Sequence, residues 1–476
     1  MKKKIVWILV SCLMVLSLVI ASCAPKAEEA AKEEAAAKVT TKEEATKKEV
    51  TEEAVAPSVE VPQYGGTITL ALAGDPMAMF YDLFGLGSAA PQQLSHQRVW
   101  DGDWTKGPAG GYGTNQLTWG EGSYLPEFQT GFLAESVTWV IDPGGKTVTT
   151  TVKVKKGIRW ALDPNNQYSR LVNGREVTTD DIIWCLDQRM NNTEAMNYQF
   201  FPQQRGIHCV KTGPQEFQVT HPFAIALEGF MRLFNSVMQP PELYQKYGRE
   251  ACTNWKYDVG TGPFIISDYI PANLVALDRN PNYFKKDPIG PGQGNQLPYL
   301  DKVRYVVIPD RSTQQAALRT GNVDQMGGFL GFTLEEKTLM INQVPALKVA
   351  QRGAGLVSPI FMRVDKPELP FYKKAVRRAM MMATDFQTIN KSLYAGLGDL
   401  VSWPYRYAPA YADLYLGLDD PECPDSVREL YTYNPDKAKE LLKEAGYPTG
   451  FKTTLTITAV QADYYSIIKD LSLIHI

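Results

Sequence analysis

Cys23 is the residue whose surroundings most clearly predict covalent chemistry. Three lysines open the chain, residues 5–20 are almost wholly apolar, and the small residues Ala21 and Ser22 immediately precede the cysteine. A basic start, a short apolar stretch and small residues at a cleavage point are typical of a signal peptide. We therefore predict that 1–22 is a lipoprotein signal peptide and that lipidation of Cys23 tethers the exported chain to a membrane. The alternative is an uncleaved membrane anchor.

The adjacent carboxylates Asp180 and Asp181 are the next candidates for chemistry, because paired acids can act as general acid and base. They follow Thr178, a residue type that caps helices, and acids are stabilised in the first turn of a helix. We therefore predict that they cap a helix. The sequence contains no GxSxG, HExxH or phosphate-loop pattern. These absences do not exclude an enzyme, because carboxylate pairs leave little trace in a sequence, but they make one less favoured. We predict a protein that is not an enzyme and that uses no cofactor.

Histidine and cysteine do not form a metal-binding pattern. The four histidines are His96, His208, His221 and His475. Their spacing is not that of metal ligands, so we predict no metal site. Beyond the predicted lipidation site the cysteines are Cys185, Cys209, Cys252 and Cys423. One or two disulfides are possible outside the cytoplasm, and the sequence does not choose among the pairings.

Residues 24–61 have the composition of a spacer. They include ten Glu, six Lys and ten Ala but no aromatic residue, so they cannot bury enough apolar surface to fold alone. Glu precedes Lys by four residues at 28/32 and 34/38, which favours a transient helix. We predict that 23–61 is a lipid-anchored charged linker. An acidic partner-binding segment is the alternative.

The remaining residues, 62–476, are enough for two or three lobes with their own cores. The whole chain has 49 basic and 52 acidic residues. This near balance argues against a protein that binds nucleic acid, and against one that binds membranes through a polybasic surface.

Several secondary-structure elements can be predicted from residue patterns. Strands are predicted at 67–72 and 303–308, and a hairpin joins 137–141 to 146–154 through an Asp-Pro-Gly-Gly turn. The second arm alternates Val148, Thr150, Val152 and Val154, which places them on one face of a strand.

Helices are predicted after Thr178, after Ser312, over 370–384, and after Asn434, where Pro435 occupies the first turn. A further strand is predicted at 453–458, followed by a helix near Tyr464. The Gly-rich stretch at 290–294 and residues 104–124 are predicted to be loops. This mixed order of strands and helices indicates an α/β fold.

Segments spread along the chain together resemble the extracellular solute-binding proteins of family 5, the oligopeptide, dipeptide and nickel group that serves ABC transporters. The segments are Tyr64-Gly65-Gly66-Thr67, Leu133-Ala134-Glu135-Ser136, Lys156-Gly157-Ile158-Arg159-Trp160, Val177-Thr178-Thr179-Asp180-Asp181, Val259-Gly260-Thr261-Gly262-Pro263-Phe264, Arg279-Asn280-Pro281-Asn282-Tyr283-Phe284, residues 317–324, residues 373–385 and residues 434–447.

The resemblance implies a periplasmic-binding-protein-like fold of type II, with two lobes, a hinge and an inserted subdomain. It implies lobe I at 62–97 and 225–355, the inserted subdomain at 98–224, and lobe II at 356–476. The residues from 100 to 129 form a longer stretch than is usual in the family. Family members also continue beyond Ile476, so we expect the second lobe to be incomplete.

The resemblance further implies a solute held between the lobes and delivered to an ABC permease and its ATPase, by a monomeric binding protein. A peptide is the expected ligand. An oligosaccharide is an alternative, and nickel is less favoured because histidines are few. Candidate ligand contacts carried over from the family are Gln92, Gln93, Leu94, Tyr198, Ser402 and Trp403. Two other classes stay open, a lipid-tethered secreted hydrolase and an adhesive surface lipoprotein.

Overall fold

The computed structural model describes residues 61–76, 90–106, 128–234, 236–326, 332–349, 360–401, 407, 415–457 and 462–470. The chain divides into two units, Met1–Val59 and Glu60–Ile476, and every described residue belongs to the second. The predicted lipidation site, the spacer and most of the predicted loop at 104–124 therefore lie outside the described residues.

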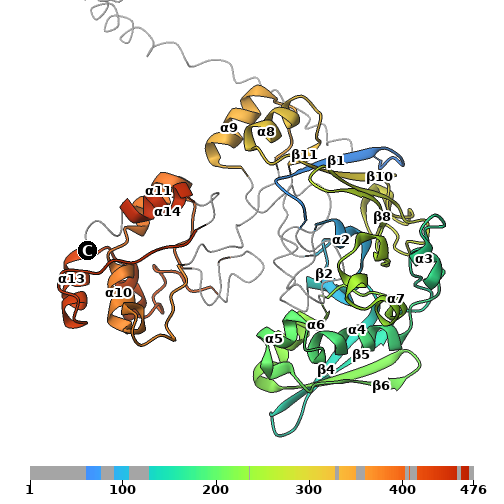
Figure 1. The fold of residues 1–476 in the computed structure, drawn as a ribbon, viewed down its shortest axis with the longest axis horizontal. Helices are drawn as coiled ribbons and strands as arrows, with labels where there is room; N and C mark the ends of the chain where they lie inside the picture. Colours follow the sequence, from blue (N-terminus) through green and yellow to red (C-terminus); the bar gives the residue numbers. More distant parts are fainter. Residues whose placement is uncertain are drawn as a thin grey trace, which may run out of the picture. The chain divides into compact units, whose positions relative to one another are not determined.

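A five-stranded mixed sheet joins the start of the second unit to strands from much later in the sequence (Figure 1). Strand β1 (Thr67–Leu72) runs parallel to β10 (Lys302–Val307) and to β11 (Gln325–Met326). Strands β9 (Leu274–Arg279) and β8 (Phe264–Ile270) continue the sheet in antiparallel fashion. The predicted strand at 67–72 is confirmed with the same bounds, and the one at 303–308 within one residue.

A four-stranded antiparallel sheet contains the predicted hairpin. Its order is β4 (Ala134–Ile141), β5 (Thr147–Val154), β7 (Glu216–Pro222) and β6 (Cys209–Gly213). The turn between β4 and β5 forms because the Asp142 carboxylate accepts hydrogen bonds from three backbone N–H groups that follow it. These bonds lower the pKa of Asp142, although partial desolvation opposes them.

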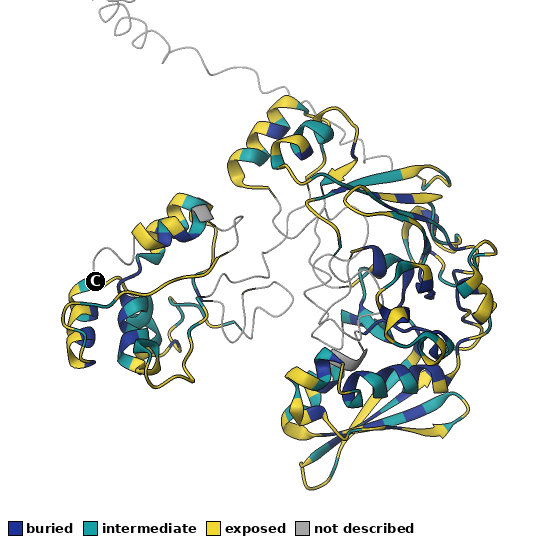
Figure 2. Ribbon diagram, in the orientation of Figure 1, coloured by how far each residue is buried: buried dark blue, intermediate teal, exposed yellow. Residues whose placement is uncertain are grey.

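One face of β5 is buried, as its alternating pattern predicts. Val148, Thr150, Val152 and Val154 all face inward. The core behind this face includes Phe217 from β7 and apolar residues of helix α4 (Thr179–Asn191). Figure 2 shows the alternation of buried and exposed residues along these strands.

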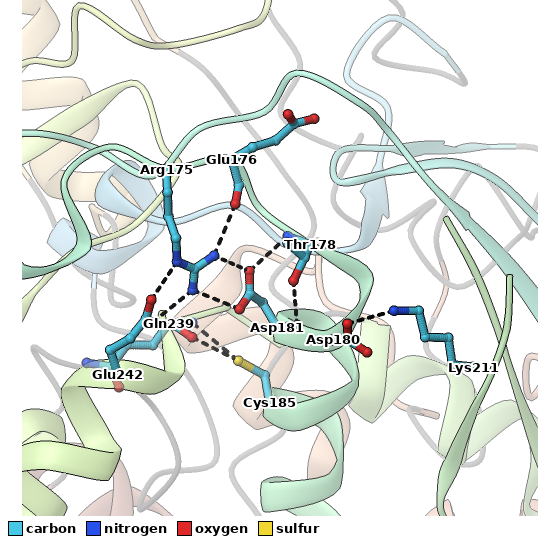
Figure 3. Close-up of polar contacts among 9 residues, drawn as sticks. All are labelled: Arg175, Glu176, Thr178, Asp180, Asp181, Cys185, Lys211, Gln239 and Glu242. Carbon is cyan, nitrogen blue, oxygen red and sulfur yellow. Dashed lines mark hydrogen bonds and ion pairs between the residues drawn. The ribbon is translucent and has the colours of Figure 1, made fainter. Parts of the chain in front are cut away.

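Helix α4 begins with a capping box, which confirms the predicted cap. The Thr178 hydroxyl accepts the Asp181 N–H at 3.2 Å, and the Asp181 carboxylate accepts the Thr178 N–H at 2.8 Å. Asp180 instead forms an exposed ion pair with Lys211 at 2.6 Å (Figure 3). The two carboxylates thus have separate structural roles and are not a catalytic pair.

A two-stranded ribbon and several short helices surround these sheets. The ribbon pairs β2 (Trp100–Gly102) with β3 (Gln129–Gly131). The helices are α2 (Ala90–Ser95), α3 (Gln167–Val172), α5 (Met196–Phe200), α6 (Ala226–Phe234), α7 (Pro241–Tyr247), α8 (Arg311–Arg319) and α9 (Leu334–Gln343), with 3₁₀ turns at Pro202–Gln204, Phe223–Ile225, Gly248–Cys252, Trp255–Tyr257 and Gly290–Gly292. The last of these turns lies in the stretch predicted to be a loop.

The core of the four-stranded sheet extends past the predicted end of the inserted subdomain at 224. Met238, Leu243, Tyr257 and Val259 belong to the same cluster of buried residues as Val152. We therefore propose that the inserted subdomain continues to about residue 260 and that lobe I resumes at β8.

The C-terminal described segment contains helices of its own. They are α10 (Lys374–Met382), α11 (Phe386–Tyr394), α12 (Asp425–Tyr431), α13 (Pro435–Glu444) and α14 (Ala462–Ile468). Val376, Ala379 and Met382 of α10 pack against Leu441 and Leu442 of α13. The predicted cap by Asn434 is confirmed, because its side chain accepts the Lys437 N–H at 3.0 Å.

Three predicted elements need correction. The helix expected at 370–384 is shorter, because Lys373 has extended backbone dihedrals and separates the 3₁₀ turn Pro370–Tyr372 from α10. The helix expected after a Ser312 cap begins two residues earlier, at Arg311. Asp310, not Ser312, caps it by accepting the Thr313 N–H at 2.7 Å.

The strand expected at 453–458 is also wrong over its described residues, 453–457, which have no regular secondary structure. A strand needs a neighbour for its backbone hydrogen bonds. No strand of the described chain pairs with these residues. The helix expected near Tyr464 is confirmed as α14.

Among the described ranges, no helix has both the length and the apolar content needed to cross a membrane.

Candidate ligand-binding region

Helix α2 carries three of the candidate ligand contacts, and the structure gives them different surroundings. Gln92 is completely buried, and Leu94 packs against the core of the five-stranded sheet. Gln93 is exposed. Gln93 is thus the exposed residue of the three, whereas Gln92 and Leu94 face the protein interior.

Two glycines of the Val259–Phe264 motif hold α2 in place. The Gly262 N–H donates to the Ser95 carbonyl at 2.9 Å. A Cβ at Gly262 would lie 2.5 Å from the Ser95 carbonyl carbon, and one at Gly260 would collide with the Ser95 carbonyl oxygen. This close backbone contact explains why the motif needs glycine at both positions.

The 279–284 motif supports the 259–264 motif through Asn280. Asn280, which is buried, donates from its side chain to the Gly262 carbonyl at 2.8 Å. Its backbone N–H donates to the Pro263 carbonyl at 2.9 Å. The 259–264 and 279–284 motifs therefore form one support for α2.

Ser95, His96 and Asp258 lie together at the C-terminal end of α2 without the geometry of a hydrolase. The Ser95 hydroxyl lies 2.9 Å from His96 Nδ1, and an Asp258 oxygen lies 3.5 Å from the same nitrogen. A catalytic triad instead places the nucleophile and the acid on opposite ring nitrogens. Burial raises the pKa of Asp258, although His96 and Ser95 oppose this shift. The geometry thus gives no support to a hydrolase at this position.

Among the described residues, no identified interaction joins the other candidate residues to α2. Tyr198, on α5, packs on a small core with Ala195, Val237 and Cys252, and the Arg205 guanidinium lies 4.3 Å from its ring centroid. Ser402 and Trp403 lie outside the described residues.

The four described cysteines, Cys185, Cys209, Cys252 and Cys423, are all buried free thiols, so no disulfide joins any two of them. Cys185, for example, donates to the Gln239 carbonyl at 3.1 Å (Figure 3). Burial raises the pKa of the Cys209 thiol, and the Asp187 carboxylate adds to this effect. Within the part of the chain that is described, no three His, Cys, Asp or Glu side chains gather as a metal site.

Sequence reasoning missed a group of lysines around the β2–β3 ribbon. Lys106 donates to the Gln129 carbonyl at 3.1 Å and Lys155 to the Gly131 carbonyl at 2.7 Å. The Lys285 ammonium lies 3.0 Å from the ring centroid of Phe132. The three lysines are far apart in the sequence, so no local pattern could have revealed that they converge.

Comparison with known proteins places this architecture in a family. Residues 130–468 match the bacterial extracellular solute-binding proteins, family 5 Middle. The glutathione-binding protein GsiB of Escherichia coli K12 is 26% identical over 327 residues, which cover 68% of this chain and 54% of GsiB. The dipeptide-binding protein of the same strain is 24% identical over 345 residues, which cover 68% of this chain and 57% of that protein. The chain thus spans about half the length of these relatives.

Solved structures show the same fold. The oligopeptide-binding protein AppA of Bacillus subtilis, in complex with a nonapeptide, has a TM-score of 0.57 and 19% identity, with 86% of this chain and 73% of AppA covered. DppA of Helicobacter pylori, in complex with the peptide STSA, has a TM-score of 0.56 and 23% identity, with 87% of this chain and 72% of DppA covered. The fold is therefore the α/β fold of periplasmic binding proteins.

The family and these relatives are solute-binding proteins and not enzymes. The match covers most of the chain. This protein belongs to family 5 of the bacterial extracellular solute-binding proteins.

Proposed function

We propose that this protein is the substrate-binding lipoprotein of an ABC importer and that its ligand is a peptide. The family match over 130–468 carries the binding function. Peptide is favoured because similar proteins are named for binding glutathione and a dipeptide, and similar structures contain bound peptides. The protein would act as a monomer and deliver its ligand to a membrane permease with its ATPase.

In this proposal two lobes close on the ligand, and closure is a hinge equilibrium that the ligand shifts by contacting both lobes. Gln93 is the proposed contact from α2, because it is exposed on a helix that the glycine motif holds rigidly. Tyr198, Ser402 and Trp403 stay predictions for the remainder of the site.

Peptide binding is expected to stabilise the purified protein against heat. A ligand at 100 times its dissociation constant adds about 2.7 kcal/mol to the free energy of unfolding. The measurement is a thermal shift with dipeptides, glutathione and the oligosaccharide maltotriose, together with chromatography of each ligand after incubation. A shift without cleavage of a peptide supports the proposal. A shift with maltotriose alone supports the oligosaccharide alternative, and cleavage of a peptide supports a hydrolase.

Replacing Cys23 by alanine is expected to release the protein from membranes or to leave its signal peptide uncleaved. The physical reason is that the thiol is the proposed point of acylation, and small residues precede it at the cleavage position. Fractionation and intact mass of Cys23→Ala test this, with Cys12→Ala as the control within the apolar stretch. A Cys23→Ala protein processed and membrane-bound like the parent would refute lipidation at Cys23.

A further inference from the structure

Lysines from three separate segments converge on strand β3 and the residue after it. Lys106 and Lys155 each donate to a β3 carbonyl, at 3.1 Å and 2.7 Å. Lys285 places its ammonium 3.0 Å from the centroid of the Phe132 ring. Lys155 and Lys285 therefore reach consecutive residues, Gly131 and Phe132.

Two of the carboxylates beside this group, Asp101 and Asp103, are already engaged. Asp101 pairs with Arg98 at 2.7 Å. Asp103 lies 3.7 Å from Lys106 and accepts hydrogen bonds from the Thr105 N–H and hydroxyl at 3.0 Å and 2.6 Å. Across the described ranges, no ion pair includes Lys155 or Lys285.

Lys155 and Lys285 are also only partly exposed to solvent. Burial and the nearby charge of Lys155 together lower the pKa of Lys285 to about 7, against the opposing influence of Asp103 and Asp101. Burial likewise lowers the pKa of Lys155, against the influence of Glu135. Two desolvated ammonium groups that form no ion pair with a described carboxylate are unfavourable, and an added anion would relieve this.

We propose that Lys155 and Lys285 form a subsite for a carboxylate group of the bound solute, beside the apolar face of Phe132. The proposal rests on the proposed solute-binding function and refines it to a ligand that carries a carboxylate. Each lysine supplies a point charge with three N–H donors. The hydrogen bond of Lys155 to Gly131 uses one of its donors, and the contact of Lys285 with the Phe132 ring leaves donors of Lys285 for a ligand. Lys285 follows directly on the 279–284 motif that supports α2, so the subsite and Gln93 are attached to the same structural support.

Calorimetry with trialanine and with trialanine amide tests the subsite. Lys285→Met is expected to weaken binding of trialanine by about tenfold, equivalent to the loss of one moderate interaction, and to leave binding of the amide unchanged. Lys286→Met removes the same charge from the adjacent exposed residue and should behave as the parent. Equal weakening for both peptides, or no weakening for either, would overturn the subsite.

A second measurement separates the subsite from the proposed function. Lysines of the full chain are reductively methylated with ¹³C, and the signal of Lys285 is identified by its absence in Lys285→Met. Succinate should shift this signal more at about pH 6 than at about pH 8, because the ammonium form attracts the anion. Succinamide should leave it unchanged.

The outcomes of the two measurements are distinct. If no peptide binds but succinate moves the Lys285 signal, the peptide function falls and the subsite stands. If trialanine binds while the signal stays fixed with every probe, the function stands and the subsite falls. A shift with inorganic phosphate as large as that with succinate overturns the assignment to a carboxylate.

Discussion

Gly262→Ala is expected to lower the free energy of unfolding by about 3 kcal/mol, a value typical of overpacking that cannot relax. The new Cβ would lie 2.5 Å from the Ser95 carbonyl carbon and 2.7 Å from the His96 nitrogen. Both are backbone atoms, so no side-chain rotation can remove the clash. Urea denaturation followed by tryptophan fluorescence measures the loss.

The same substitution is expected to weaken peptide binding, because α2 must shift to admit the Cβ and Gln93 shifts with it. Gly74→Ala is the matched control. A Cβ at Gly74 meets no atom within 4 Å, so this change should be neutral or slightly stabilising through the entropy of the unfolded chain. A Gly262→Ala protein as stable as Gly74→Ala would contradict the close packing of α2 on the glycine motif.

Arg175→Met is expected to lower the free energy of unfolding by about 3 kcal/mol. This value is at the lower end of the range for removing one partner of a buried ion pair, because the Arg175 and Glu242 side chains are partly exposed. The guanidinium donates to both oxygens of Asp181, at 2.7 Å and 2.9 Å, and to Glu242 Oε2 at 2.8 Å (Figure 3). It thereby ties the capped start of α4 to α7. Asp181, whose side chain is 7% exposed, would keep its charge without its partner.

This effect should depend on pH. Partial burial raises the pKa of Glu242, but the hydrogen bonds from Arg175 and from the backbone, together with the charge of Arg175, outweigh burial and lower this pKa from its ordinary value. A carboxylate with a lowered pKa stabilises the fold above its unfolded pKa, and this contribution is lost as pH falls through the folded value. The stability difference between the parent and Arg175→Met should therefore narrow below about pH 4.

Arg170→Met serves as the control for Arg175→Met. Arg170 is exposed and makes one long hydrogen bond, 3.3 Å to the Pro164 carbonyl. Its replacement should change the free energy of unfolding by about 0.5 kcal/mol or less. Equal effects of the two substitutions, or a stability difference for Arg175→Met that does not vary with pH, would show that the network contributes little.

Local sequence patterns predicted the elements whose causes lie within a few residues. The Thr178 capping box and the Asn434 cap were predicted because a cap side chain bonds to an N–H three residues away. The 137–154 hairpin was predicted because its turn residues and strand alternation are contiguous. Errors arose even locally where two residues compete, as Asp310 and Ser312 do for the start of α8.

Features that depend on distant partners were not predicted correctly. Residues 453–457 have a strand-like composition, yet without a paired neighbour among the described strands they remain irregular. Of the candidate contacts on α2, the sequence could not separate the exposed Gln93 from the buried Gln92, because burial of a short helix depends on what packs against it.

The sequence by itself determined the family, through a set of motifs spread along the chain, and it predicts the tether at Cys23. Only the tertiary structure decided why Gly260 and Gly262 are needed, since the backbone they admit belongs to α2. It likewise decided that Lys155 and Lys285 converge on Gly131 and Phe132. Electrostatic interactions and close packing depend on the distances between atoms in space. The sequence gives only how far apart two residues are along the chain, so it could not show these contacts.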